Sequence, residues 1–184
     1  TADPRLSTEV AQVFDLLERK IIVPQCKHML VSPFTTRSGL KSLLKQEIEH
    51  ANAGREAYAI LKMNSLEDPE MIERIYEACQ AGVKIKMIVR GICCAVPGMK
   101  GVSENLEVIS IVDRFLEHAR VYIFGNGGAE RLFLASADWM TRNLDRRVEV
   151  IFPVYDKEVS SEIRYIVGRQ LQDNTKARGL KTTQ

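Results

Sequence analysis

Long apolar runs are missing from this sequence, and its charge is nearly balanced. The 184 residues carry 26 Lys and Arg against 24 Asp and Glu, a formal net charge of +2. This balance argues against a chain that holds nucleic acid or an anionic membrane by bulk positive charge, although it leaves room for a local basic pocket. Every uncharged stretch falls short of the roughly 18 apolar residues that a membrane span needs, so no transmembrane helix is expected.

The four cysteines lack the spacing of a metal site. Cys26, Cys79, Cys93 and Cys94 contain no C-x-x-C pair, and two adjacent cysteines cannot readily serve one tetrahedral metal ion. We expect buried, free thiols in a reducing compartment, as in a cytoplasmic protein. Residues 1–5 neither resemble a signal peptide nor begin with Met, so the chain is expected to be a piece of a longer protein.

Length and composition are those of one globular domain. With 45% hydrophobic and 27% charged residues, the chain is neither disordered nor fibrous, and 184 residues can bury a sizeable core. We therefore expect residues 1–184 to form a single domain. Strand-like apolar runs cover 29–32, 57–63, 83–89, 119–124, 131–135 and 147–152, and helix-like amphipathic patterns cover 7–21, 36–52, 69–81 and 156–172.

The order of these segments predicts an α/β fold with a mixed sheet between helices. Strand 57–63, helix 69–81 and strand 83–89 follow one another, which implies a right-handed crossover and parallel pairing. Gly125 to Gly128 (GNGG) lies between two strand-like runs and predicts a hairpin. The polar tail from Asp173 is expected to fray.

Helix boundaries and inward faces can also be predicted. The first helix is expected to begin with Ser7 or Thr8 as its N-cap. Asp68, followed by Pro69, is expected to cap the third. The side chains expected to face the core are Val10, Val13, Phe14 and Leu17 in the first helix and Val159, Ile163, Ile166 and Val167 in the last.

Polar and cationic side chains follow two of the predicted strands. Arg90 comes directly after strand 83–89, and Lys62 and Asn64 lie at the end of strand 57–63. In α/β proteins ligands bind at the carboxyl ends of strands, where a guanidinium can hold a phosphate with two hydrogen bonds. The alternative for Arg90 is a salt-bridged or snorkelling surface residue.

His118 lies two residues before Arg120 in Phe115 to Tyr122 (FLEHARVY). If a strand includes both positions, the two side chains point to the same face, so that an imidazole lies next to a cation. Such a pair is a candidate phosphate partner, with the histidine acting as nucleophile, acid or positioning donor. A purely structural histidine is the alternative.

Arg147 and Glu149 alternate with apolar residues in strand 147–152 and would share one face. Polar side chains inside a buried strand are costly unless a ligand or partner satisfies them. They are therefore candidates for a ligand-facing surface, with a solvated edge strand as the alternative.

Several catalytic motifs are absent from the sequence. It contains no Walker A motif, no H-E-x-x-H, no nucleophile elbow and no carboxylate cluster with metal-ligand spacing, so no metal ligands are expected in this chain. What remains is a set of Arg, Lys, His and Asn. That set suits the binding and transfer of phosphoryl groups, with the protein neutralising most of the charge.

Five longer stretches are more distinctive than single residues: Lys62 to Leu66 (KMNSL), Val89 to Cys94 (VRGICC), Arg114 to His118 (RFLEH), Ser136 to Met140 (SADWM) and Asn143 to Glu149 (NLDRRVE). In this order they closely resemble bacterial polyphosphate kinases of the histidine-phosphorylated class. The resemblance runs from about residue 1 to residue 170. It implies that residues 1–184 are the second of two phospholipase D-like domains at the C-terminal end of a longer chain.

The resemblance also implies roles for individual residues. His118 matches the second histidine of the family, so it is expected to be catalytic and to contact nucleotide. Arg90 matches the arginine that contacts the nucleotide phosphates. The histidine that becomes phosphorylated, a nucleotide-contacting tyrosine and the arginines associated with magnesium are expected outside this chain. The residues expected to bind phosphate or polyphosphate here are Arg147, which matches a basic residue lining the polyphosphate tunnel, and Lys62, Asn64 and Arg120.

The family's reaction is the reversible transfer of the ATP γ-phosphate to a growing polyphosphate chain through a phosphohistidine. The resemblance therefore implies ATP, ADP and inorganic polyphosphate as ligands, Mg²⁺ arriving with ATP as cofactor, and companion domains of the same chain as partners. It further implies a homo-oligomer that is cytoplasmic and loosely attached at the inner membrane. Without the nucleophile, the isolated segment is expected to be inactive.

Two positions depart from the phospholipase D pattern H-x-K-x4-D. Arg120 stands at the lysine position and Gly125 at the aspartate position. Both missing groups would serve a phosphodiesterase, so hydrolysis of lipid or nucleic acid is disfavoured. Two alternatives stay open: a phospholipase D-like phosphodiesterase, and a non-catalytic module that binds polyphosphate.

Overall fold

The computed structural model describes residues 3–181. The helices are α1 (Pro4–Leu17), α2 (Thr36–Asn52), α3 (Pro69–Gln80), α4 (Thr141–Asp145) and α5 (Lys157–Leu171), with a 3₁₀ turn η1 (Asn126–Gly128). The strands are β1 (Leu30–Val31), β2 (Tyr58–Met63), β3 (Lys84–Val89), β4 (Leu106–Ser110), β5 (Arg120–Phe124), β6 (Arg131–Ala135), β7 (Val150–Pro153) and β8 (Arg178–Gly179). Within this part of the chain the strands form one eight-stranded sheet in the order β1-β7-β6-β5-β2-β3-β4-β8.

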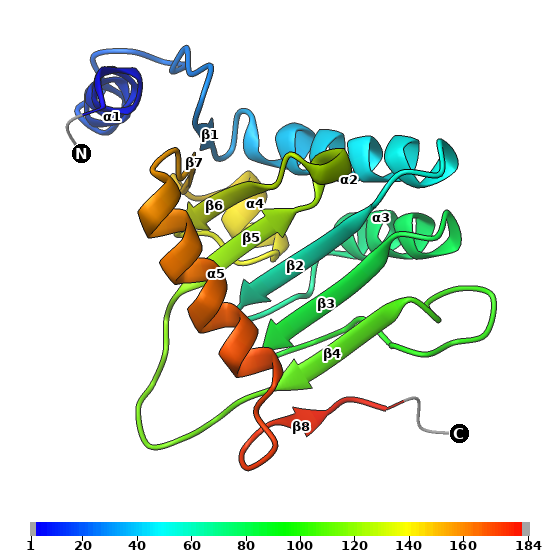
Figure 1. Ribbon diagram of the computed structural model, residues 1–184. Helices are drawn as coiled ribbons and strands as arrows, with labels where there is room; N and C mark the ends of the chain where they lie inside the picture. Colours follow the sequence, from blue (N-terminus) through cyan, green and yellow to red (C-terminus); the bar gives the residue numbers. More distant parts are fainter. Residues whose placement is uncertain (1–2, 182–184) are drawn as a thin grey trace.

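The sheet is mixed, as the sequence predicts. β2, β3 and β4 are parallel, so the predicted parallel pairing of β2 and β3 across α3 is confirmed, while β5 pairs antiparallel with β2 and β6 antiparallel with β5. One edge of the sheet therefore collects the carboxyl ends of β2, β3, β4 and β6 and the amino ends of β5 and β7. We call it the site edge. In Figure 1 the arrowheads of β2, β3 and β4 point to it.

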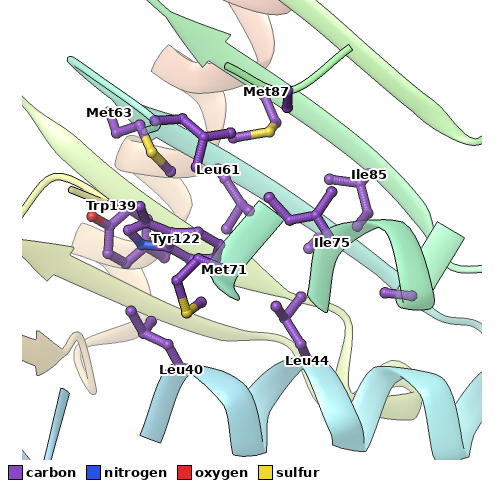
Figure 2. Close-up of a cluster of buried hydrophobic side chains, with 14 of the residues drawn as sticks. Leu40, Leu44, Leu61, Met63, Met71, Ile75, Ile85, Met87, Tyr122 and Trp139 are labelled. Atoms are coloured by element: carbon purple, nitrogen blue, oxygen red, sulfur yellow. The ribbon is translucent and has the colours of Figure 1, made fainter. Parts of the chain in front are cut away.

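Helices cover both faces of the sheet (Figure 1). Leu40 and Leu44 of α2 and Met71 and Ile75 of α3 pack with Leu61 of β2 in the main core cluster, which Figure 2 shows. On the other face, α5 crosses the strands and buries Val167 in a second cluster. The smaller cluster also contains Ile60, Ile88, Val121, Ile123 and Leu132.

The prediction for the start of α1 is wrong, and so is the prediction for its apolar face. Asp3, not Ser7 or Thr8, caps the helix: its carboxylate accepts the N–H of Arg5, and Pro4 takes the first helical position. Phe14 and Leu17 remain 60% and 57% exposed. The reason is visible in Figure 1, where α1 lies apart from the sheet that the other helices cover.

The inward stripe of α5 is narrower than predicted. Val167 is buried, and Ile163 and Leu171 pack against the same cluster, whereas Val159 and Ile166 are 44% and 48% exposed. The packed residues recur every fourth position, so they form one narrow apolar line along the helix.

Two predictions near the C-terminal end are also wrong. β7 begins at Val150 rather than Arg147, because residues 141–145 form α4 and the chain reaches the sheet later. The tail from Asp173 does not simply fray: the Asp173 carboxylate accepts the N–H of Ala177, and β8 pairs with β4. The last three residues of that tail, like the first two residues of the chain, lie outside the described residues.

The cysteines are free thiols in the described structure, but not all are buried. Cys79 is buried, where burial raises its pKa to about 12, whereas Cys94 is exposed, contrary to the expectation of uniformly buried thiols. No helix within residues 3–181 is long and apolar enough to cross a bilayer.

Candidate functional site

Parallel pairing brings Asn64 and Arg90 together at the site edge. Met63 and Val89 are partners in the β2–β3 register, so the residues that follow them lie side by side. Nε of Arg90 donates to Oδ1 of Asn64 at 2.8 Å. The side-chain amide thus fixes one edge of the half-buried guanidinium.

His118 lies against the same guanidinium. It belongs to the long segment between β4 and β5, and it is exposed. Its Nδ1 lies 3.3 Å from Nη2 of Arg90. Because a guanidinium can only donate, Nδ1 accepts this bond, and a neutral His118 carries its hydrogen on Nε2. His118 precedes β5 rather than lying in it, so the strand argument for its orientation does not apply.

Within residues 3–181, the side chains that hydrogen-bond to Arg90 are an amide and an imidazole, those of Asn64 and His118, rather than a carboxylate. Across residues 3–181, no carboxylate forms an ion pair with Arg90, whereas Arg120 and Lys62 nearby each have one. A half-buried guanidinium without a carboxylate partner has donors that suit an anionic ligand.

Arg120 is bound from two sides. Its Nε and Nη2 donate to the carboxylate of Asp138 at 3.2 and 3.1 Å, and its Nη1 donates to the backbone carbonyl of His118 at 2.9 Å. Asp138 is 7% exposed and also accepts the backbone N–H of Asn64 at 2.7 Å. Three of the five N–H donors of Arg120 are therefore occupied within the chain.

Lys62 is 7% exposed and points toward α5. Its Nζ hydrogen-bonds to the Glu117 carboxylate and, at 2.8 Å, to Oε1 of Gln170. The ammonium holds the pKa of Glu117 below its ordinary value, so Glu117 is ionised at neutral pH. One small recess at the site edge is lined by these side chains, among others: Lys62, Glu117, Gln170, Arg90 and Asn64.

Arg147 does not line that recess. It follows α4, its side chain is 54% exposed, and its Nη1 lies 3.9 Å from Oε1 of Glu149. Glu149 in turn accepts hydrogen bonds from Nδ2 of Asn143 at 2.8 Å and from the Ser136 hydroxyl. Arg147 thus lies near the start of β7, apart from the Arg90–His118 pair.

Sequence reasoning singled out none of Asp138, Glu117 and Gln170. Asp138 gave a usable signal, because a carboxylate between Ala137 and Trp139, which are both fully buried, requires a counter-charge. Gln170 gave none, since it reaches Lys62 from a helix 108 residues further along the chain.

The carboxylates at the site edge do not fit a protein-bound metal ion. Asp138 is paired with Arg120, Glu117 with Lys62, and Glu149 with Asn143 and Ser136. Within residues 3–181, no group of three His, Cys, Asp or Glu side chains could hold a metal.

The sheet order, the two helical layers and the polar site edge define a phospholipase D-like fold. The chain superposes on Nuc from Salmonella typhimurium, a phospholipase D family member, with a TM-score of 0.58 over 84% of this chain and 97% of that one. Sequence identity is 12%, so this likeness concerns the fold alone.

A narrower family is defined by sequence. The family model described as polyphosphate kinase C-terminal domain 2 matches residues 29–184, and the chain belongs to this family. It is 47% identical over 178 residues to the polyphosphate kinase of Vibrio vulnificus strain YJ016, covering 97% of this chain and 25% of that protein. It also superposes on the polyphosphate kinase of Porphyromonas gingivalis with a TM-score of 0.95 and 40% identity, over 99% of this chain and 28% of that one. The chain thus spans about a quarter of these relatives.

Proposed function

We propose that this chain is the C-terminal phospholipase D-like domain of a longer polyphosphate kinase, which transfers the γ-phosphate of ATP reversibly to inorganic polyphosphate. Family membership supports the assignment of the domain. The observation that carries the proposed role is the Arg90–His118 pair, in which Nη2 of a guanidinium without a carboxylate partner within residues 3–181 lies 3.3 Å from Nδ1 of the imidazole. Residues 1–184 act as one domain of that enzyme in this proposal.

The proposed reaction divides the work between this domain and the rest of the enzyme. A histidine outside the 184 residues attacks the γ-phosphorus of ATP in line and becomes phosphorylated, ADP leaves, and the phosphoryl group then passes to the end of polyphosphate. Arg90 contacts the nucleotide phosphates and neutralises charge that develops on the phosphoryl oxygens. Nε2–H of His118 donates to the bridging oxygen as it leaves.

The remaining cations take supporting roles in this proposal. Arg147, near the start of β7, contacts the polyphosphate chain as it passes, and Lys62 and Asn64 contact phosphate at the site edge. Mg²⁺ arrives with ATP, and its protein contacts belong to other parts of the enzyme. We also propose a cytoplasmic homo-oligomer, peripherally attached to the inner membrane.

Phosphodiester hydrolysis is the second candidate, because the fold is shared with Nuc. Two features of the site disfavour phosphodiester hydrolysis. Arg120, at the lysine position of the phospholipase D pattern, is bound by Asp138 and the His118 carbonyl. A Cβ at Gly125, the aspartate position, would lie 2.7 Å from Cδ1 of Tyr58. Neither phosphodiesterase group therefore has a place here.

Replacing His118 in the full-length enzyme tests the proposal. His118→Ala is expected to lower the rate of polyphosphate synthesis about a hundredfold, the effect of losing about 3 kcal/mol of stabilisation in a dry site. His28→Ala is the matched control, since His28 bonds to the Tyr155 hydroxyl at 2.6 Å, outside the recess. Wild-type turnover by His118→Ala would refute the proposed function.

Two further measurements separate the alternatives. Hydrolysis of a chromogenic phosphodiester by the full-length protein, lost in His118→Ala, would favour the phosphodiesterase. A non-catalytic binding module would be favoured if the full-length protein bound polyphosphate in a salt-sensitive way but made none from ATP.

A further inference from the structure

A closed ring of hydrogen bonds joins five residues at the site edge. Arg90 binds the Asn64 side chain and the His118 ring, and Arg120 binds the His118 carbonyl and the Asp138 carboxylate. Asp138 closes the ring by accepting the backbone N–H of Asn64 at 2.7 Å. Asn64 and Arg90 follow the ends of β2 and β3, His118 and Arg120 lie just before and at the start of β5, and Asp138 follows β6.

Asp138 is the most firmly held member of this ring. Its neighbours Ala137 and Trp139 are fully buried. The Ala137 carbonyl accepts the Tyr122 hydroxyl at 2.5 Å, and the Trp139 carbonyl accepts the backbone N–H of Asp68 at 3.0 Å. The carboxylate is therefore fixed by the main core on both sides.

His118 is held quite differently. It is exposed and lies in residues 111–119, which have no regular secondary structure. Within the described chain, the side-chain contacts that hold it are the Arg90 bond to its ring and the Arg120 bond to its carbonyl. The position of the imidazole therefore depends on where the Arg120 guanidinium lies, and Asp138 sets that position.

We propose that Asp138 is a positioning residue that acts through Arg120 to hold His118 in its reactive orientation. This inference rests on the proposed function of His118. It gives Arg120 a connecting role in place of a phosphate contact, since the Asp138 carboxylate cancels its charge and, with the His118 carbonyl, occupies three of its donors. Arg90, which has no carboxylate partner within residues 3–181, remains the cation available to substrate.

Kinetics of the full-length enzyme can test this inference. Asp138→Asn keeps the shape of the side chain but removes the charge that holds Arg120, so kcat for synthesis is expected to fall tenfold to about a hundredfold. KM for ATP should stay within about twofold, because Arg90 keeps its own contacts. The matched control is Glu130→Gln, which removes another carboxylate bound to an arginine, Arg164, at the opposite edge of the sheet. Its kcat should match the wild type.

Arg120→Gln separates a connecting role from a phosphate contact, and it serves if Asp138→Asn fails to fold. A connecting role predicts a fall in kcat with KM for polyphosphate unchanged. A rise in that KM with kcat unchanged would overturn the inference. Combining Arg120→Gln with Asp138→Asn should cost no more than the worse single variant, since both break one chain of contacts.

The inference can fail separately from the proposed function. If His118→Ala has a strongly reduced rate of polyphosphate synthesis but Asp138→Asn has the wild-type rate, the positioning role of Asp138 is wrong and the proposed function of His118 stands. Additive losses in the Asp138→Asn, Arg120→Gln double variant would likewise overturn it. If His118→Ala keeps full turnover, the proposed function fails first.

Discussion

Nη2 of Arg90 lies 3.3 Å from Nδ1 of His118, although 28 residues separate the two in the chain. The arginine donates to Nδ1 at the edge of the imidazole and leaves Nε2 to carry the hydrogen. Asn64 holds Nε of the same guanidinium at 2.8 Å, so the orientation of the arginine is itself fixed.

Replacing Arg90 should weaken nucleotide binding strongly. Arg90→Gln in the full-length enzyme removes charge-assisted hydrogen bonds worth about 1.5–3 kcal/mol, so KM for ATP should rise ten- to a hundredfold. Arg90→Lys should recover part of this binding but lower kcat, because an ammonium cannot contact Asn64 and His118 in the same planar geometry. Steady-state kinetics with varied ATP measures both. Arg131→Gln, which removes an exposed arginine stacked on Phe133, is the control. An unchanged KM in Arg90→Gln would contradict a phosphate contact.

If Lys62 binds phosphate, as proposed, Glu117 should compete with that phosphate for its ammonium group. Since the Glu117 pKa is held below its ordinary value, the carboxylate is charged at neutral pH and occupies the ammonium. Glu117→Gln should therefore tighten polyphosphate binding about threefold, near the middle of the 0.2–1 kcal/mol range for partly exposed ion pairs. Titration of the full-length protein with polyphosphate at low and high salt measures it.

The control for that experiment is Glu107→Gln, which breaks the exposed pair with Lys86 on neighbouring strands. It should leave polyphosphate affinity unchanged. Weaker binding by Glu117→Gln would mean that Glu117 orders the recess for its ligand rather than competing with it.

Arg147 should affect polyphosphate and not ATP. Its side chain is 54% exposed and its contact to Glu149 is long, so Arg147→Gln removes a solvent-screened charge. We expect KM for polyphosphate to rise two- to fivefold at low salt, matching about 0.4–1 kcal/mol, with the difference shrinking at high salt. Arg164→Gln, at the opposite edge, should change neither constant. A selective rise in KM for ATP would contradict the polyphosphate role.

The pH dependence of stability should report on Asp68. Burial disfavours its charged form, but hydrogen bonds from Arg37, Thr141 and the Met71 N–H outweigh this and lower its pKa below the ordinary 3.8. A depressed carboxyl pKa stabilises the fold above the unfolded value, and this contribution is lost as pH falls through the folded value. Thermal unfolding should therefore show stability declining below about pH 4.

Asp68→Asn tests the origin of that decline. The variant leaves the Arg37 guanidinium partly uncompensated, so it should cost about 3 kcal/mol at pH 7 and flatten the acid dependence. Asp145→Asn removes a carboxylate from the same arginine, but one that is 42% exposed, and should cost less than about 1 kcal/mol. Equal losses of unfolding free energy in Asp68→Asn and Asp145→Asn would contradict the prediction that the buried carboxylate contributes more than the exposed one.

The backbone of the site could be predicted from the sequence, because its strands are continuous apolar runs. Residues 57–63 and 83–89 predict two buried parallel strands, and parallel strands necessarily bring Asn64 and Arg90 to one edge. The sequence also predicts Asp68, followed by Pro69, as the N-cap of α3, and the structure confirms it. β4 (Leu106–Ser110) is not among the predicted strands; it pairs parallel with β3 and antiparallel with the two-residue strand β8.

The partners of the site residues could not be predicted in the same way. Lys62 contacts Gln170 because the C-terminal turn of α5 lies next to the end of β2. Arg120 contacts Asp138 because of the register of the β5–β6 hairpin. Such contacts depend on helix placement and side-chain direction rather than on local pattern. For the same reason a strand starting at Arg147 was wrong: the alternation of polar and apolar residues is present, but α4 delays the pairing until Val150.

Restoring the aspartate of the phospholipase D pattern should damage the fold without creating a phosphodiesterase. A Cβ at Gly125 would lie 2.7 and 2.8 Å from two ring carbons of Tyr58, so Gly125→Asp forces the ring to move. We expect a loss of about 1–3 kcal/mol of stability, typical of overpacking, in thermal unfolding of the chain. Gly179→Asp is the control, because nothing lies within 4 Å of its Cβ position. Hydrolysis of a chromogenic phosphodiester by Gly125→Asp, with stability unchanged, would show that the site still accommodates phosphodiesterase chemistry.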